Sequence, residues 1–249
     1  MEIILKKIFL LLLFLTSFSF GQTATEIVKK SNDNNLGVTS QGHSKMTVVR
    51  PDWSREVEMK SWSKGTDYYL IYITAPARDK GQVFLKRKME LWNWMPSIGR
   101  MIKLPPSMMM QSWMGSDFTN DDLLKQSSIV KDYEHKIVSE ETLDNYETWK
   151  IDLIPKPNAP VVWGKISMWI TKKHFLQIKV EYYDETLELI NTMTGSKIKN
   201  VGDRMLPTKM EIIPADKPGN KTILEYDSIV FDKPINDRFF SQQNMKKIK

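Results

Sequence analysis

Apolar and polar residues alternate over most of the chain, which is the period of β-strands with one buried face. Met46 and Val48 share one side of an expected strand at 43–50, and Val57 and Met59 share one side of the next, at 53–62. Residues 67–74, DYYLIYIT, are apolar or aromatic on both faces. Such a strand lies between two layers, or it lines a cavity with its inner face.

Further short strands follow, separated by residues typical of turns. The turns carry Gly65, Asp144-Asn145, Gly195, Gly202 and Pro218-Gly219. The expected strands are 82–88, 89–95, 100–104, 130–138, 146–154, 162–171, 175–183, 186–193, 206–213 and 222–231. This regular succession predicts a mainly β protein with an up-and-down antiparallel sheet, closed or half closed.

Helices are expected only at a few places. Thr23 and Glu26 form a capping box that begins a short helix, which ends near Asn34-Asn35. Asp117 or Thr119 can cap a second short helix through Leu123 and Leu124. A C-terminal helical segment is capped by Asn236 or Asp237, with Phe239, Phe240 and Met245 as its packing residues.

Residues 81–123 form an unusual segment in the middle of the pattern. Seven of the fifteen methionines lie in it, together with three tryptophans. Methionine is flexible and polarizable, so a methionine-rich surface can adapt to apolar ligands of variable shape. We interpret the segment as the floor and lid of an apolar ligand cavity; the alternative is ordinary core packing. Met108, Met109 and Met110 are consecutive, so a short helix cannot turn all three toward one core.

Residues 1–21 have the features of an export signal. Lys6 and Lys7 precede the apolar run 8–14, and Ser19-Phe20-Gly21 offers a small-residue cleavage site. The run is too short for a membrane span of about 20 residues. We expect residues 22–249 to form one exported domain.

The composition of the chain excludes several classes of function. The chain has no cysteine, which excludes disulfides, thiolate metal sites and a lipid-anchored N-terminal cysteine. The net charge of +6 is spread along the chain without the basic blocks that nucleic-acid binding requires. We expect no nucleic-acid partner, no cofactor and no metal.

Catalytic motifs are also missing. His43, His135 and His174 are far apart and show no metal-binding spacing, so they are expected to be strand-surface residues. Asp117, Asp121 and Asp122 fit a helix start better than a metal site. Glu56 and Glu58 fit a solvated sheet face better than a glycosidase pair. The sequence therefore predicts that the protein is not an enzyme.

Taken together, LWNWMPSIGRMIKL, SMMMQSWMGSDFTNDDL and the terminal NDRFF, in this order around a long meander, resemble the LolA-like outer-membrane lipoprotein-sorting proteins. The resemblance covers essentially all of residues 22–249, and its most specific part is 91–123. It implies a half-open antiparallel β-barrel, a curved meander sheet, with short helices covering an apolar concave face. It also implies a periplasmic carrier that binds acyl chains of lipoproteins or similar amphiphiles and sorts them toward the outer membrane.

The resemblance further implies partners and site residues. An inner-membrane transporter and an outer-membrane acceptor are the expected partners of a monomeric carrier. An accessory lipid-handling module of an inner-membrane exporter is the alternative function. In the family's soluble carrier a strand arginine tethers the lid; the chain departs from that pattern, and Arg55 and Lys64 are both candidates. The expected lipid-binding residues are Tyr69, Ile71, Trp92, Trp94, Met101, Ile102, Leu104, Met108, Met109, Met110, Trp113 and Met114.

Overall fold

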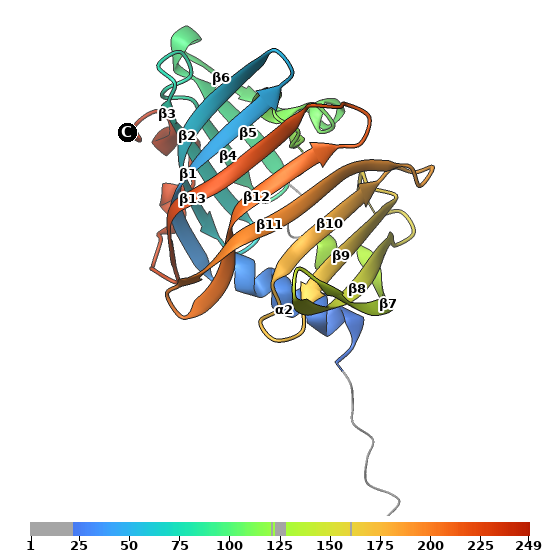
Figure 1. The fold of residues 1–249 in the computed structure, drawn as a ribbon. Coiled ribbons are helices and arrows are strands. Elements are labelled where there is room, and N and C mark those ends of the chain that lie inside the picture. The colour runs from blue at the N-terminus through green and yellow to red at the C-terminus, as the bar shows by residue number, and fades with distance from the viewer. Residues whose placement is uncertain (1–21, 121, 123–127, 160) are drawn as a thin grey trace, which may run out of the picture.

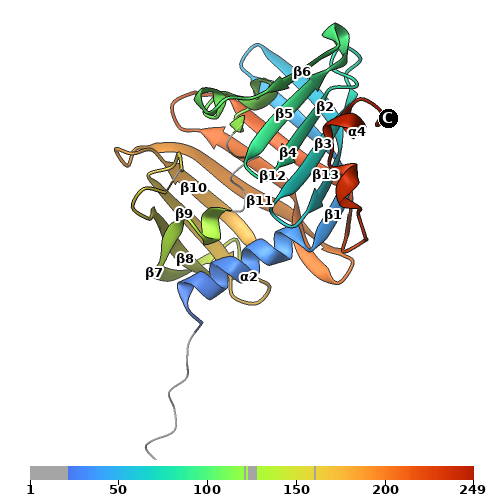
Figure 2. The same cartoon turned by 180° about the vertical axis from the view of Figure 1, so that it is seen from behind.

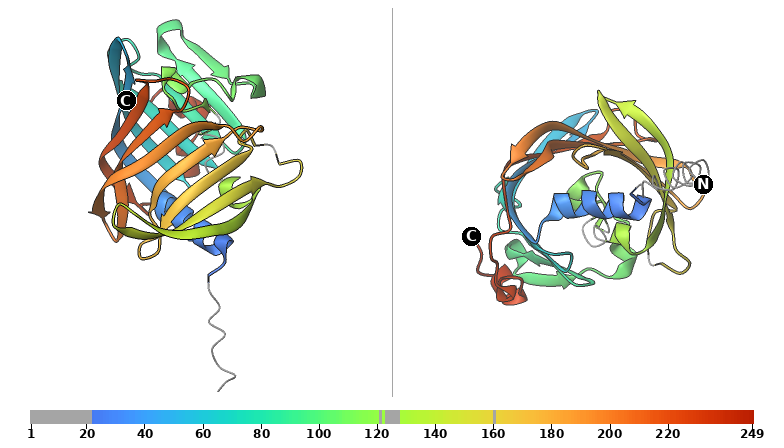
Figure 3. Two further views of the ribbon diagram at one scale, coloured as in Figure 1. Left: turned by 45° about the vertical axis from the view of Figure 1, so that its right-hand side comes forward. Right: turned by 90° about the horizontal axis from the view of Figure 1, so that it is seen from below.

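The fold is a single curved antiparallel sheet, which a computed structural model describes for residues 22–120, 122, 128–159 and 161–249. The expected export signal, residues 1–21, lies outside this part of the chain. Thirteen strands follow one another in the order β6-β5-β4-β3-β2-β1-β13-β12-β11-β10-β9-β8-β7. The sheet curls into an incomplete ring (Figure 1 and Figure 3, right). The expected half-open, mainly β architecture is confirmed.

Strands β1 to β6 form the first half of the sheet, and strands β7 to β13 form the second half. The first six are β1 Thr39–Arg50, β2 Trp53–Lys64, β3 Tyr68–Ala75, β4 Val83–Arg87, β5 Glu90–Met95 and β6 Arg100–Lys103. The others are β7 Tyr133–Leu143, β8 Tyr146–Pro155, β9 Lys165–Thr171, β10 Gln177–Tyr183, β11 Leu189–Val201, β12 Arg204–Pro214 and β13 Lys221–Phe231. Short helices complete the described chain: α2 Ala24–Leu36, η1 Pro96–Ile98, η2 Pro106–Met108, η3 Trp113–Gly115, η4 Ser128–Val130, η5 Asp237–Phe239 and α4 Gln242–Met245.

The first and last strands pair in the middle of the sheet. β1 is bonded to β2 on one side and to β13 on the other. The two edges are therefore β6 and β7, which are consecutive in the chain but lie at opposite ends of the sheet. The chain between them, residues 104–132, is named the crossing segment here; its residues 121 and 123–127 lie outside the described part.

Helix α2 runs across one end of the hollow (Figure 2). The expected capping box is present, with Thr23 and Glu26 each bonded to the backbone of the other. Ile27 and Val28 are fully buried against the concave face of the second half of the sheet, where Ile151 and Ile166 belong to the same cluster. Burying both side chains contributes several kcal/mol, at roughly 1.5–3 kcal/mol each, so α2 is held by the sheet and not by its own propensity.

The C-terminal segment covers the convex face of β3 and β4 (Figure 2). Phe240 and Met245 are buried against Leu70 and Leu85, and Phe239 packs beside them. Asn236 is the residue that caps this segment, since its side chain accepts a hydrogen bond from the Arg238 backbone. Strand β3 thus has an apolar layer on each side, which explains its two apolar faces.

Strand β11 differs from the sequence prediction. It continues through Gly195, which the pattern assigned to a turn. A side chain at Gly195 would lie 2.9 Å from the Gln177 carbonyl and 3.0 Å from Pro207, so glycine here permits close approach of neighbouring strands. Strand β7 also runs five residues past its expected end at Val138, to Leu143.

Candidate functional site

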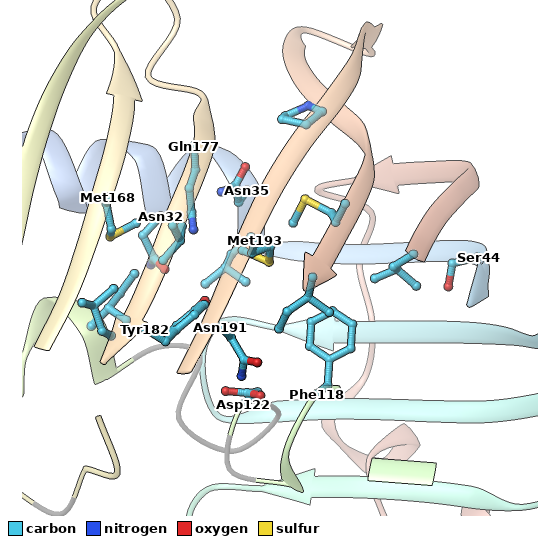
Figure 4. A pocket seen from close by; sticks show the side chains of 18 of the residues that line it. Asn32, Asn35, Ser44, Phe118, Asp122, Met168, Gln177, Tyr182, Asn191 and Met193 are labelled. Carbon is cyan, nitrogen blue, oxygen red and sulfur yellow. The ribbon is translucent and has the colours of Figure 1, made fainter. Parts of the chain in front are cut away.

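A cavity of about 240 Å³ lies inside the curved sheet. Its wall comes from the concave face, from α2 at one end and from the crossing segment (Figure 4). Apolar and aromatic residues predominate: Leu36, Met46, Met59, Tyr69, Ile71, Trp113, Phe118, Ile129, Tyr133, Val161, Trp163, Ile166, Met168, Val180, Tyr182, Met193, Leu206, Pro207, Met210, Ile212, Leu224, Tyr226 and Ile229. The cavity is therefore suited to an apolar ligand or to the apolar part of an amphiphile.

Alternation along the strands produces this wall. Met46, Met59 and Ile71 occupy neighbouring strands, and all three turn toward the hollow, where they form one buried cluster with Trp113. The intervening side chains Glu56 and Glu58 are exposed on the other face. Because side chains alternate between the faces of a strand, the apolar-polar period places the methionines inside and the carboxylates outside.

A small polar group interrupts the apolar wall. Asp122, Asn191 and Tyr182 lie near one another in the close-up (Figure 4). Burial raises the pKa of the Asp122 carboxyl, although hydrogen bonds from Thr119 oppose the shift. Burial also raises the pKa of Tyr182, so its phenol is neutral and can donate a hydrogen bond.

The crossing segment closes one side of the cavity with a small loop. The Trp113 amide donates to the Phe118 carbonyl at 2.7 Å, and Ser112 pairs with Thr119. Trp113 is only 4% exposed and meets the ring of Phe84 edge-on at 5.2 Å between centroids. Trp113 therefore anchors the segment to the sheet and also forms part of the cavity wall.

Arg50, at the end of β1, ties this loop to the sheet. Its Nη1 and Nη2 each donate to one carboxylate oxygen of Asp117 at 3.1 Å, and Nη2 also donates to the Gly115 carbonyl at 2.9 Å. Thr222 on β13 donates to Asp117 at 2.6 Å. The Arg50 and Asp117 side chains are 14% and 7% exposed, so solvent screens their ion pair weakly.

The two basic residues that were candidates from the sequence for tethering the lid contact different parts of the chain. Arg55 donates through Nη2 to the Met114 carbonyl and thus reaches the loop. Lys64 instead contacts Asp237 and the Ile235 carbonyl of the C-terminal segment. Sequence reasoning missed Arg50 and assigned Asp117 to a possible helix cap. The Thr119 hydroxyl instead accepts a hydrogen bond from the Asp122 amide at 3.1 Å, which is the contact of a helix cap. Leu123 and Leu124, through which this helix was expected to run, lie outside the described residues.

The expected lipid-binding residues separate into groups. Tyr69, Ile71 and Trp113 line the cavity, and Met114 packs against the buried cluster beside it. Trp92, Trp94 and Met101 pack on the convex face with the C-terminal segment. Ile102, Leu104, Met108, Met109 and Met110 are not part of the cavity wall.

The consecutive methionines differ in exposure. Met110 is 54% exposed, whereas Met108 and Met109 are half-buried. The carbonyl of Met108 accepts a hydrogen bond from the Asn120 side chain at 2.9 Å, which fixes this turn to the loop.

The described residues contain no group of three or more His, Asp or Glu side chains placed to hold a metal ion. His135 contacts Thr25 and the Ile129 carbonyl and joins α2 to β7; burial lowers its pKa. None of the helices in the described part of the chain is long and apolar enough to span a membrane.

Solved structures share this fold. A DUF1329 family protein from Desulfovibrio piger is 20% identical, with 89% of this chain and 97% of that chain covered and a TM-score of 0.82. An outer membrane lipoprotein-sorting protein domain from Vibrio parahaemolyticus is 21% identical to this chain. The match covers 90% of this chain and 98% of that chain, with a TM-score of 0.78. A LolA superfamily protein from Nitrosomonas europaea is 23% identical to this chain. The match covers 90% of this chain and 100% of that chain, with a TM-score of 0.77.

Comparison with curated proteins finds no significant match. A family model described as that of an uncharacterized protein matches residues 65–247, which is well over half of the chain. The chain therefore belongs to that family, and its fold is the one shared by proteins of the LolA superfamily.

Proposed function

We propose that this protein is a periplasmic carrier that binds the acyl chains of lipoproteins or similar amphiphiles and sorts them toward the outer membrane. The observation that carries the proposal is the apolar cavity of about 240 Å³ inside the half-open sheet. An apolar cavity of about 150 Å³ is large enough to admit benzene. A single acyl chain is therefore a reasonable occupant in size and in chemistry.

The energy of such binding comes from the tail itself. Each methylene that leaves water contributes about 0.8 kcal/mol, so a tail can be retained without a catalytic or covalent group. Methionines from several strands line the cavity, including Met46, Met168 and Met193. Their flexible side chains can repack around tails of different shape.

The crossing segment supplies a possible gate. Trp113 and Phe118 are part of the cavity wall, and Arg50 and Arg55 hold the loop that carries them. Movement of this loop changes the apolar area offered to a tail, so loading and release can be coupled to the breaking of the Arg50–Asp117 pair. The names of the Vibrio parahaemolyticus and Nitrosomonas europaea proteins support a lipoprotein-sorting class of function.

Native mass spectrometry tests the proposal. Protein exported into the periplasm of its expression host and purified without detergent is expected to carry additional masses that organic solvent extracts and that match acyl-containing molecules. Met210→Trp, which fills the cavity from β12, is expected to remove these masses. Met101→Trp, on the convex face, serves as the matched control. A wild-type protein that stays free of ligand after exposure to lipoprotein or fatty acid would contradict the proposal.

A further inference from the structure

The wall of the cavity has a polar part as well as an apolar one. The polar part comes from the second half of the sheet, where Tyr182 on β10 and Asn191 on β11 line the cavity near Asp122 of the crossing segment (Figure 4). The first half of the sheet contributes Met46 and Ile71, which belong to a buried apolar cluster. A ligand that fills this one cavity therefore meets hydrogen-bonding groups in one part and apolar side chains in another.

Tyr182 and Asn191 are direct neighbours across two strands. They face each other in the register of β10 with β11, and the next pair on the same face, Val180 and Met193, also lines the cavity. Side chains that are directly opposite in an antiparallel pair have Cβ atoms about 4.5–5.5 Å apart and project from the same face. The phenol and the amide therefore form one compact polar spot in the wall.

The protein itself does not satisfy the polar atoms of this pair. In the part of the chain that the structure describes, neither the Asn191 amide nor the Tyr182 phenol makes a hydrogen bond. Asn191 is 6% exposed, and its amide has two N–H donors and a carbonyl acceptor. A buried amide without partners costs stability, whereas leucine has nearly the same shape without that cost. Whatever occupies the cavity must therefore supply the partners of Asn191.

The charges around this pair favour an uncharged partner. Among the described residues that line the cavity there is no lysine, arginine or histidine, and Asp122 is the one carboxyl. Asp122 interacts electrostatically with Tyr182, so it also acts on a group bound there. A buried anion is costly without a positive partner. Burial raises the pKa of Asp122 and so favours its neutral form, which leaves a cation without a full counter-charge as well.

We infer that Tyr182 and Asn191 bind a neutral group that both donates and accepts hydrogen bonds, of which a carboxamide is the closest match, in an amphiphile whose tail occupies the apolar part of the same cavity. The Asn191 carbonyl accepts from the N–H of this group, and the Tyr182 hydroxyl donates to its carbonyl. The inference rests on the proposed function and narrows it, because it selects acyl amides over fatty-acid anions and over ligands without a hydrogen-bond donor.

Isothermal titration calorimetry on the purified chain, freed of co-purifying ligand, tests this inference with four probes that share a heptyl tail. Octanamide and 2-nonanone have nearly the same shape, but only the amide has N–H donors. Octanoate carries a negative charge and octylamine a positive one. The wild-type chain is expected to bind octanamide about tenfold more tightly than either charged probe, because each of these brings an unpaired charge into the cavity.

Asn191→Leu removes the amide and keeps the shape of the side chain. The ratio of octanamide affinity to 2-nonanone affinity is expected to fall about tenfold, because the N–H of octanamide loses its acceptor. Without ligand, this variant is expected to unfold at the same urea concentration as the wild-type chain or at a higher one. Tyr182→Phe removes the donor to the carbonyl of both probes and is expected to weaken both by about threefold to tenfold.

Asn200→Leu makes the same change at an exposed position of the same strand, β11. This variant is the matched control and is expected to keep the affinity ratio of the wild-type chain.

The possible failures are distinct. An unchanged affinity ratio in Asn191→Leu would overturn the carboxamide site and leave the carrier function standing. A marked loss of stability of that variant without ligand would also overturn it, because the amide would then serve the fold. Tightest binding of octylamine would replace the site with one for a cation beside Asp122, and tightest binding of octanoate with one for an anion. Absence of binding by all four probes and by laurate would overturn the carrier function as well.

Discussion

Arg50 and Asp117, 67 positions apart in the chain, form a two-pronged ion pair that joins the end of β1 to the loop of the crossing segment. Both distances are 3.1 Å, and both side chains are mostly buried. Thr222 completes the contact from the neighbouring strand. Three separate parts of the sequence therefore meet at the loop that closes one side of the cavity, and the first prediction concerns this junction.

Arg50→Met is expected to lower the free energy of unfolding, or of local opening of the loop, by about 3–5 kcal/mol. The reason is that Asp117 would be left with a buried and uncompensated charge. Amide hydrogen exchange at residues 113–118 and urea unfolding measure the effect. Lys45→Met, which breaks an exposed pair with Glu56, is the control and is expected to change stability much less. Equal effects of the two substitutions would show that Arg50 does not hold the loop.

Asp122→Asn is expected to change how stability depends on pH. Burial raises the folded-state pKa of Asp122 above its ordinary value of 3.8, so the folded protein binds this proton more tightly than the unfolded chain. The contribution favours folding at pH below about 4 and is lost as pH rises through the folded pKa. The variant is therefore expected to gain stability relative to wild type between pH 4 and neutrality, as urea midpoints would show.

Asp184→Asn is the control of opposite sign. Hydrogen bonds from the Glu188 and Thr186 backbone and from the Thr186 hydroxyl lower the pKa of Asp184. Its contribution is present above the ordinary pKa and is lost as pH falls through the folded pKa. If the two variants showed the same pH trend, burial would not be what controls the pKa of Asp122.

Phe240→Ala is expected to destabilise the protein by about 3–5 kcal/mol, the usual range for removing a buried phenylalanine. Phe240 is fully buried and stacks on Tyr68 at 5.4 Å between ring centroids. Phe239→Ala is expected to have a smaller effect, because that ring is only partly buried. Urea unfolding of both variants measures the difference. Similar losses would mean that the C-terminal segment is not anchored through Phe240.

Met210→Trp and Met101→Trp separate the two apolar faces of the sheet. The first is expected to weaken laurate binding at least tenfold by filling the cavity, and the second to leave it unchanged. Calorimetric titration with laurate makes the comparison, with thermal unfolding as a check of the fold. Loss of binding in the Met101 variant alone would place the ligand on the convex face, with Trp92 and Trp94.

The local sequence pattern was sufficient to predict most of the strands. The alternation in β1 and β2 and the capping box at Thr23 depend on neighbours within a few residues, so the sequence contains their cause. The two apolar faces of β3 were also readable, although the pattern alone did not show that a cavity lies on one side and the C-terminal segment on the other.

The sequence pattern did not show which side chains of β5 point to the concave face. Trp92 and Trp94 pair with Leu85 and Val83, which point to the convex side. A shift of one residue in strand register exchanges the two faces, so a strand with aromatic residues on one side does not reveal which side is concave. For the same reason the site prediction placed these tryptophans with Tyr69 and Ile71, which occupy the other face.

The tether was missed because its two partners are distant in sequence. Asp117 has the local context of a helix start, and nothing near it identifies Arg50 as its partner. A mostly buried charge at the end of a strand needs a counter-charge. That requirement could have indicated a partner for Arg50, but only the fold determines which acid is within reach.

The pairing of the first strand with the last has a mechanical consequence. Among the described strands, each is joined by backbone hydrogen bonds to the next strand in the sheet, and the edge strands β6 and β7 are not paired with each other, which leaves a seam in the wall. Spreading at this seam breaks no ladder between strands, while widening anywhere else does. In the described part of the chain the width of the hollow can therefore change at this seam without loss of strand pairing, and the crossing segment that bridges the seam is held to β1 by the Arg50–Asp117 ion pair.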